Sequence, residues 1–356
     1  MPKRIGFLYE KMLDKTFIRN TIIKASKHKH SRRDVRKVLY NLDFYTERLY
    51  DILKTESFVP AMPHEHDIYD VSSQKWRTIK VVPFFPDSII HWILVETMKP
   101  VLVRGMYHWS CASIPGRGGV YAGKYIKHIL RNHPKNCKYA AEIDIKKFYP
   151  SIPIERLNTA LSRKIKDKKF LKIIFDILES CGGGLAIGYY ICQWLANFYL
   201  ESLDHFILKI DGVKYMVRYM DNITIFGANK KKLRKARAQI AEFMKDRLGV
   251  EMKKNWQIYP TAKRMVSAVG YRFSKTHVIL RKRNFLRLTR QCRRAIKKIK
   301  ARKRIHFRLA AGLISRIGQI KHCDSHKIRV KYIDPIGIKN LKEVIRNENK
   351  RRLAAK

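Results

Sequence analysis

Two short stretches of the sequence each carry one acidic residue where a strand should end. Asp221 lies in "VRYMDNITIFG" (217–227), which predicts a strand, a tight turn and a second strand. Asp144 closes the apolar run "YAAEIDI" (139–145). A carboxylate is costly to bury unless it is paired, metal-bound or at a sheet edge. If both strands deliver their aspartate to one edge, the two carboxylates can hold divalent cations for phosphoryl transfer.

Each aspartate also has a simpler interpretation when it is taken alone. Asp-Asn is a favoured pair in a two-residue β-turn, and Ile223 and Ile225 alternate as in a half-buried strand. Asp144 alone is explained equally well by an ion pair or an edge position. The metal hypothesis therefore depends on the two strands meeting.

The charge of the chain indicates its partner. The 356 residues include 77 Lys and Arg against 29 Asp and Glu, which gives a net charge of +48 and a pI near 10.3. This surplus repels itself until a polyanion neutralises it, so nucleic acid is the expected partner. An anionic membrane surface is the rival, but the sequence has no apolar run of about 18 residues and no signal-peptide pattern. We therefore expect a soluble, cytoplasmic protein with no membrane partner.

The cysteines and histidines indicate neither a disulfide framework nor a zinc site. The six cysteines form no CxxC motif and no Cys/His cluster, so we expect reduced packing residues. "KHKH" (27–30) has no Cys or carboxylate at ligand spacing, which favours a basic surface over a zinc site.

The elements that must position the aspartates follow from periodicity. The first ~70 residues show helical spacing with a basic face, and Asp87 is a reasonable N-cap for the helix after "VVPFFP". A helix is expected over about 229–247, and strands over "AVGYRF" and "HVILRK". Residues 281–308 carry 14 Lys or Arg and no acid. They predict one cationic helix with an apolar stripe of Phe285, Leu288, Cys292, Ile296 and Ile299.

The segments and their order resemble a known family. In chain order they are "RTIKVVPFFPD", "SIPGRGG", "DIKKFYPSI", "GLAIGYYICQ", "YMDN", "EMKKNWQ" and "VGYRF". They resemble the fingers segments and motifs A to E of bacterial and phage reverse transcriptases. The resemblance is closest to the enzymes of diversity-generating retroelements and to the related defence-associated (unknown-group) enzymes. Each motif alone is weak, and the shared order over about 75–282 carries the resemblance.

The resemblance implies an α+β right-hand polymerase of fingers, palm and thumb, with an antiparallel palm sheet and a helical thumb. Residues 1–74 would be a basic helical N-terminal extension. Residues 75–280 would be fingers and palm, and residues 281–356 a helical thumb with a basic C-terminus.

It also implies a catalytic site. Asp144 and Asp221 would bind two Mg²⁺ ions, or Mn²⁺ in their place, with the backbone carbonyl of Ile145 and the amide of Asn222 as further ligands. Lys253 would protonate the departing pyrophosphate, with Lys254 as a competitor and a purely solvated lysine as the alternative.

Further positions of the family surround the nucleotide and the nucleic acid. Tyr149 would lie under the sugar and favour dNTPs over NTPs, and its alternative role is core packing. The other implied nucleotide contacts are Arg77, Lys80, Gly188 and Gln193. The implied contacts to template and duplex are Arg117, Arg287, Arg290, Arg294 and Lys298.

Three positions depart from the family pattern. Asn222 stands where a second Asp is usual, which removes one negative charge from the site. Cys192 replaces a Ser, and Ser88 replaces an Arg. Gln193 is typical of the diversity-generating branch, which is associated with error-prone copying of template adenines. Because the first Asp of the motif is the one that bridges both metals in the family, we still expect activity. A degenerate, non-polymerising subunit is the alternative.

The sequence thus predicts an enzyme that copies an RNA template or a structured noncoding RNA into DNA from dNTPs. Its setting would be a diversity-generating retroelement or antiphage defence, with an accessory protein or a second reverse transcriptase subunit as a further partner. A template-independent or protein-primed DNA polymerase, a non-catalytic RNA-binding subunit and an RNA polymerase remain alternatives.

Overall fold

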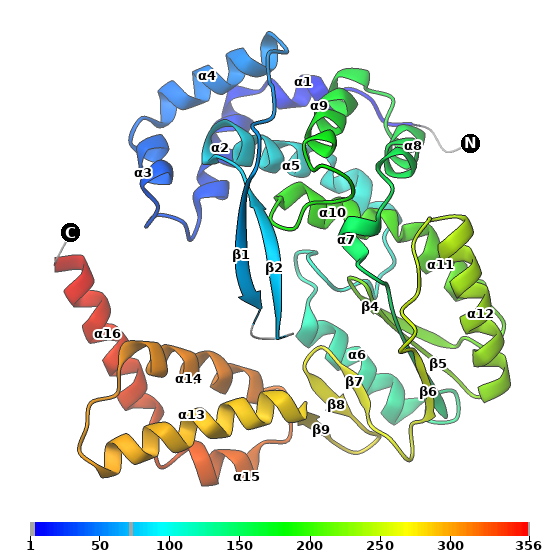
Figure 1. Ribbon diagram of the computed structural model, residues 1–356, viewed down its shortest axis with the longest axis vertical. Helices are drawn as coiled ribbons and strands as arrows, with labels where there is room; N and C mark the ends of the chain where they lie inside the picture. Colours follow the sequence, from blue (N-terminus) through cyan, green and yellow to red (C-terminus); the bar gives the residue numbers. More distant parts are fainter. Residues whose placement is uncertain (1–3, 71–73, 355–356) are drawn as a thin grey trace.

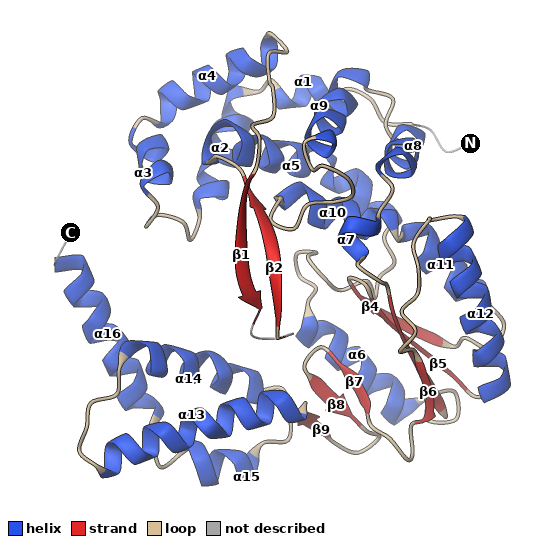
Figure 2. Ribbon diagram, viewed as in Figure 1, coloured by secondary structure: helices blue, strands red, loops and turns tan. Residues whose placement is uncertain are grey.

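The structure, a computed structural model, describes residues 4–70 and 74–354 (Figure 1). Helices and strands are interspersed along the chain, and within the described residues the strands form three antiparallel sheets (Figure 2). This confirms the predicted α+β class. No helix of the described residues is both long enough and apolar enough to cross a bilayer.

Four helices open the chain and pack into the body of the protein. They are α1 Leu8–Met12, α2 Lys15–Ser26, α3 Arg33–Tyr40 and α4 Leu42–Lys54. Their buried residues Ile18 and Leu49 belong to the same hydrophobic core as Ile93 of α5, Ile89–Gly105. The expected N-terminal extension is therefore an integral layer of the fingers, because its apolar face has a partner to bury against.

A two-stranded hairpin follows these helices and projects from the fingers (Figure 1). Its strands are β1 His64–Asp70 and β2 Lys75–Val81, paired from His64 with Val81 to Asp70 with Lys75. The expected domain boundary between residues 74 and 75 falls immediately before β2. It would separate two strands that pair with each other and form one hairpin.

The palm sheet has the strand order β4-β5-β3-β6 and is antiparallel throughout. Its strands are β3 Tyr139–Asp144, β4 Tyr215–Tyr219, β5 Asn222–Gly227 and β6 Gln257–Pro260. One face packs on α11, Glu201–Lys209, and α12, Lys230–Asp246, and the other on α6, Gly119–Asn132. β5 is buried on both faces from Ile223 onward, so the expectation of a half-buried strand was wrong. Helices on both faces explain that burial.

The alternation of side chains along the palm strands feeds two separate cores. Ile143 and Ile225 face the larger core, which they share with the N-terminal helices and α12. Ala140 and Phe226 face the second core, which also contains α6 and the thumb residue Leu288. The palm sheet is thus the common wall of both cores.

The remaining elements complete the palm and thumb. Between β3 and α11 they are α7 Phe148–Ser151, α8 Ile154–Lys164, α9 Lys168–Glu179 and α10 Tyr190–Tyr199. A small sheet of β7 Val266–Ala268, β8 Tyr271–Phe273 and β9 Val278–Leu280 leads to the thumb. The thumb contains α13 Lys282–Lys300, α14 Phe307–Ile320, α15 His326–Ile328, a π-helical turn Arg329–Ile333 and α16 Ile338–Ala354. Before α5, the segment Phe84–Ser88 forms a kinked turn in which Phe85 has an extended backbone.

Two local predictions need correction. The single helix expected over 281–308 ends at Lys300, where Arg302 takes a left-handed φ of 49° before α14 begins, and Ile299 of the expected apolar stripe is 39% exposed. Asp87 is not an N-cap. It is buried, and its carboxylate accepts a hydrogen bond from the backbone N–H of Ala61 at 2.8 Å, while α5 begins at Ile89.

Candidate active site

The β4–β5 hairpin carries Asp221 at its tip. Tyr219 pairs with Asn222 across the hairpin, so the two turn residues are Met220 and Asp221. The expected Asp-Asn turn is therefore wrong by one position, and Asn222 is the first residue of β5. Met220 takes a positive φ of 57°, as the first residue of a tight hairpin turn often does.

Asp144 and Asp221 meet, as the two-strand hypothesis required. Asp144 is the last residue of β3 and lies directly opposite Asn222 on β5, one residue from Asp221. This register brings the two carboxyl groups close enough for the charge of Asp144 to act on Asp221. Burial of Asp221, together with the negative charge of Asp144, raises the pKa of Asp221 to about 6, while Lys253 acts in the opposite direction. Such close carboxylates disfavour each other's charge unless cations lie between them.

Lys253 lies at the same place, on the side of β3 opposite Asp221. Its Nζ donates to Asp144 Oδ2 at 2.5 Å, and its backbone N–H donates to the carbonyl of Asp144 at 2.8 Å. Lys254 is exposed and forms no hydrogen bond or ion pair with either aspartate in the described residues. The structure thus brings Lys253, and not its competitor, to the aspartates, while its role as an acid stays a prediction.

The donor set fits divalent cations. Asp144 Oδ1 is buried and accepts no hydrogen bond from any described residue, so one carboxylate oxygen is left for a ligand. Within the described ranges no cluster of three or more His, Cys, Asp or Glu forms, so the site has two carboxylates only. Asn222 Nδ2 donates to Asp221 Oδ1 at 3.1 Å, and a bridge between Ile145 and Met252 fixes the backbone beside Asp144.

Tyr149 lies beside the catalytic turn. Its Oη is 3.8 Å from Met220 Sδ, and burial raises the pKa of its phenol, with Cys192 and Asp221 as smaller causes. The ring is therefore a neighbour of Asp221, and the selection of dNTPs by this ring stays a prediction.

The loop between α9 and α10 contacts both the fingers hairpin and the short helix α7 that follows β3. Gly188 has a φ of +118°, and a Cβ on it would lie 2.3 Å from the carbonyl oxygen of Lys80. The backbone N–H of Lys80 donates to the carbonyl of Ile187 at 2.8 Å, and its Nζ donates to the carbonyl of Cys181 at 2.8 Å. On the other side of the loop, Leu185 N–H donates to the carbonyl of Tyr149 at 2.8 Å. Lys80, Gly188 and Tyr149 thus belong to one assembly.

Arg77 and Gln193 lie differently from the other nucleotide-binding candidates. Arg77 is an odd number of positions from Lys80 on β2, so the two side chains lie on opposite faces of the hairpin. Arg77 Nε donates to Asp70 Oδ2 at 3.0 Å. Gln193 is exposed on α10, next to the buried Cys192. Their contacts to a nucleotide stay predictions.

The expected nucleic-acid contacts fall into two groups. Arg117 donates through Nη1 to the carbonyls of Tyr107 at 2.9 Å and Ser110 at 3.3 Å, so it stabilises its own loop. The other four lie on α13 at helical spacing. Arg287 and Arg290 line a hollow together with Gln74 at the end of the fingers hairpin.

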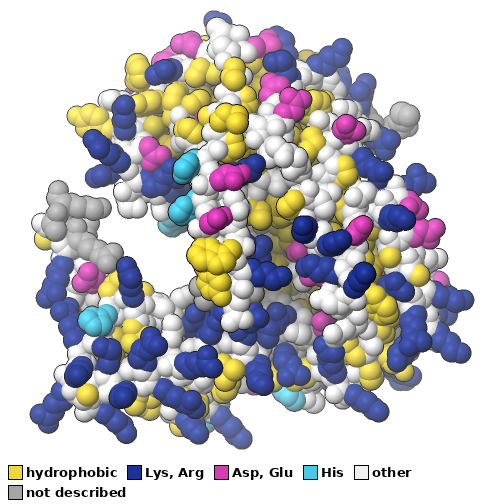
Figure 3. All heavy atoms as spheres, in the orientation of Figure 1, with side chains coloured by type: hydrophobic (Ala, Val, Ile, Leu, Met, Phe, Trp, Pro, Cys, Tyr) yellow, Lys and Arg dark blue, Asp and Glu magenta, His cyan; other side chains and the backbone are white. Residues whose placement is uncertain are grey.

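The second pair on α13, Arg294 and Lys298, lines a hollow with residues of α14 and α16. Figure 3 shows dark-blue side chains crowding the thumb below the open space between thumb and hairpin. Both hollows are therefore lined by cations of α13, and nucleic-acid binding there stays a prediction.

The sequence analysis missed three buried polar residues behind the turn: Asn197 of α10, Asp204 of α11 and Arg218 of β4. The signal was an arginine within the apolar strand "YMVRY", since a charged residue in a central strand must be paired.

Comparison with known proteins identifies the family. The profile described as "Reverse transcriptase (RNA-dependent DNA polymerase)" matches residues 64–272, more than half of the chain. An uncharacterized 91 kDa protein in the cob intron of Schizosaccharomyces pombe is 30% identical over 131 residues, which are 32% of this chain and 16% of that protein.

Among solved structures, the fold is similar to two telomerases. The C-terminally truncated apo telomerase of Candida tropicalis gives a TM-score of 0.46 at 12% identity, covering 65% of this chain and 58% of that one. The telomerase of Candida albicans in complex with a TWJ fragment of telomeric RNA gives 0.48 at 9% identity, covering 65% and 46%. The chain thus spans less than two thirds of each of these relatives. By its profile match, the chain belongs to the reverse transcriptases, the family of RNA-dependent DNA polymerases, which are nucleotidyltransferases.

Proposed function

We propose that this protein synthesises cDNA from an RNA template by two-metal nucleotidyl transfer. The observation that carries the proposal is the placement of Asp144 opposite Asn222, one residue from Asp221, which brings both carboxyl groups to one end of the palm sheet. One oxygen of this pair, Asp144 Oδ1, is buried and accepts no hydrogen bond from the described residues. Two neighbouring carboxylates with such an oxygen are suited to bind divalent cations.

Enzymes of this family use divalent metal ions. Asp144, Asp221, the carbonyl of Ile145 and the amide oxygen of Asn222 would hold two Mg²⁺ ions, or Mn²⁺ in their place. When bound, these ions supply the positive charge that activates a 3′-hydroxyl and stabilises the leaving pyrophosphate. Without the charge of a second motif Asp, the pair Asp144 and Asp221 must provide the carboxylates.

The protein's own residues would bind and orient the substrate. Lys253, held at Asp144, is placed to deliver a proton to the departing pyrophosphate. Lys80 already donates to a carbonyl of the loop at the base of the hairpin, and a triphosphate would offer its Nζ a charged acceptor instead. Tyr149 beside the turn would exclude a 2′-hydroxyl and so select dNTPs.

The thumb would hold the nucleic acid. Helix α13 has no acid along its length and carries Arg287, Arg290, Arg294 and Lys298 at helical spacing. Such a surface suits the phosphate backbone of an RNA template and its DNA product.

The biological setting is a further part of the proposal. Gln193 in "ICQ" supports an enzyme of the diversity-generating type or a related enzyme of bacterial or phage antiviral defence. The proposed place of action is the cytoplasm. A structured noncoding RNA would serve as template, and an accessory protein or a second reverse transcriptase subunit would be a protein partner.

Primer extension tests the proposal. Purified protein is given a primed RNA template and dNTPs, with parallel reactions lacking template or containing NTPs. We expect template-dependent DNA synthesis that EDTA abolishes and added Mg²⁺ restores. Long DNA made without template would instead select a template-independent polymerase. Sequencing the nucleic acids that copurify would identify the natural template.

A further inference from the structure

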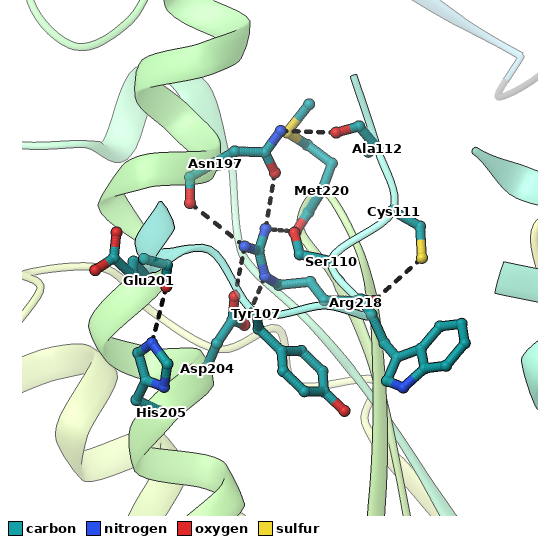
Figure 4. Close-up of polar contacts among 12 residues, drawn as sticks. Tyr107, Ser110, Cys111, Ala112, Asn197, Glu201, Asp204, His205, Arg218 and Met220 are labelled. Atoms are coloured by element: carbon teal, nitrogen blue, oxygen red, sulfur yellow. Dashed lines mark hydrogen bonds and ion pairs between the residues drawn. The ribbon is translucent and has the colours of Figure 1, made fainter. Parts of the chain in front are cut away.

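Arg218 is a fully buried cation directly behind the catalytic turn. It lies on β4, three residues before Asp221, and both its side chain and that of its ion-pair partner Asp204 have 0% exposed surface. A buried charge is stable only when it is paired and its hydrogen-bonding groups are satisfied. Arg218 meets this condition with partners from three elements (Figure 4).

All five N–H groups of the guanidinium have acceptors. Nε and Nη2 donate to the two carboxylate oxygens of Asp204 at 2.7 and 2.6 Å. Nη1 donates to the side-chain oxygen of Asn197 at 3.0 Å and to the carbonyl of Met220 at 3.1 Å. Nη2 also reaches the carbonyl of Asn197 at 3.3 Å. This planar fork of donors is specific to arginine, and a lysine ammonium cannot reproduce it.

One of these bonds acts directly on the catalytic turn. The carbonyl of Met220 belongs to the peptide that joins Met220 to Asp221, so the bond to Arg218 fixes the plane of that peptide. Met220 holds a φ of 57°, a conformation that a non-glycine residue keeps only when its surroundings impose it. Arg218 supplies such a constraint, and α10 and α11 anchor it through Asn197 and Asp204.

The same cluster extends to the loop before α6. The backbone N–H of Arg218 donates to the carbonyl of Trp109 at 3.1 Å, and its carbonyl accepts from Cys111 N–H at 2.9 Å. Asn197 Nδ2 donates to the carbonyl of Ala112 at 2.8 Å. The turn, helix α10 and this loop therefore share one anchor (Figure 4).

We propose that Arg218 is a positioning residue for the polymerase reaction, which holds the Met220–Asp221 peptide so that the Asp221 carboxylate faces Asp144. The expected effect on kcat rests on the proposed function, whereas the effect on the conformation of the turn does not. Asp204 and Asn197 act as the support that fixes the guanidinium, and none of the three touches the substrate.

The first test is Arg218→Lys, which keeps the charge opposite Asp204 but loses the bidentate fork. We expect kcat for dNTP incorporation to fall roughly 100-fold while KM for the dNTP changes by no more than about threefold, because a displaced carboxylate affects the reacting geometry. The control is Glu201→Gln on the same helix as Asp204. It removes an ion pair with Lys164 that does not reach the turn and should leave kcat unchanged.

A second variant separates positioning from stability. Arg218→Met with Asp204→Leu replaces the ion pair by apolar side chains of similar shape, a change that buried pairs often tolerate. It serves in place of Arg218→Lys if that variant does not fold. We expect the double variant to be folded, with kcat reduced as in Arg218→Lys. A folded variant of either kind whose kcat lies within about threefold of wild type would overturn the proposal.

A third measurement is independent of activity. Hydrogen exchange of the peptide covering 215–227 should be faster in Arg218→Lys than in wild type and in Glu201→Gln, since the turn has lost its anchor. Unchanged exchange there would refute the positioning role. If wild-type protein makes no DNA, the proposed function fails, and the exchange experiment alone still decides whether Arg218 holds the turn.

Discussion

Charged residues are arranged in opposite ways at the end of the palm sheet that carries Asp144 and Asp221 and on the thumb helix α13. Behind and beside the turn, Arg218 is paired with Asp204 and Lys253 with Asp144, each at a defined short distance. Helix α13 carries cations along its whole length and has no acidic residue of its own. Ion pairs with a defined geometry hold individual atoms in place, as a chemical step requires, whereas a row of cations attracts any phosphate backbone. Substitutions in the two regions should therefore fail in different ways.

The largest effect is expected from Asp221→Ala. Removing half of the carboxylate pair should lower the rate of dNTP incorporation by roughly 10³-fold or more, because the charge that would hold the metal ions is lost. Binding of template-primer, measured by fluorescence anisotropy, should stay near wild type.

Asp211→Ala is the matched control for this variant, since that carboxylate is exposed and pairs only with Lys232 in the described residues. Incorporation that persists at the wild-type rate in Asp221→Ala would remove Asp221 from the site.

Tyr149→Ala should alter selectivity more than rate. Removing the ring beside the turn should raise the relative use of NTPs over dNTPs roughly 10- to 100-fold, a range typical of a lost steric contact. The measurement is kcat/KM for one NTP and the matching dNTP. Unchanged discrimination would leave Tyr149 with a packing role only.

Neutralising the thumb should weaken binding and spare chemistry. Arg287→Gln and Arg290→Gln should each raise the Kd for template-primer several-fold and lower the slope of log Kd against log salt by about one. The rate at saturating nucleic acid should not change. Lys235→Gln on α12, an exposed cation on the far side of the palm sheet, is the control. A drop in rate at saturation would contradict the separation of the two regions.

The smallest effect is expected from Asn222→Asp. The added charge beside Asp221 should lower the Mg²⁺ concentration needed for half-maximal activity by about two- to fivefold, with little change in the maximal rate. A Mg²⁺ titration of primer extension measures this. Loss of activity would mean that the site tolerates only two carboxylates.

The sequence could predict that the two aspartates lie close together but not the structure that supports them. The meeting of Asp144 and Asp221 followed from two strand ends and a shared motif order. The predicted position of the turn was wrong by one residue. Local preference favours Asp-Asn in a turn, whereas the register of the palm sheet pairs Tyr219 with Asn222 and so places the turn at Met220 and Asp221. Asp87 was assigned to a helix end, but its partner Ala61 lies far away in sequence.

Other predictions failed because they depended on packing. The end of α13 at Lys300 has no glycine or proline to mark it. The N-terminal helices looked like an appendage because their basic surface dominates the composition. Their apolar residues, such as Ile18 and Leu49, proved to share the main core with α5.

Because the palm sheet contributes side chains to both hydrophobic cores, the thumb is packed against it and is not an independent domain. Ala140 and Phe226 on one face of that wall are buried in the same cluster as Leu288 and Leu313 of the thumb. A fragment cut before α13 would uncover part of this apolar surface to water. We expect such a truncated palm to aggregate, so the strands that carry Asp144 and Asp221 and the cationic helix belong to one folding unit.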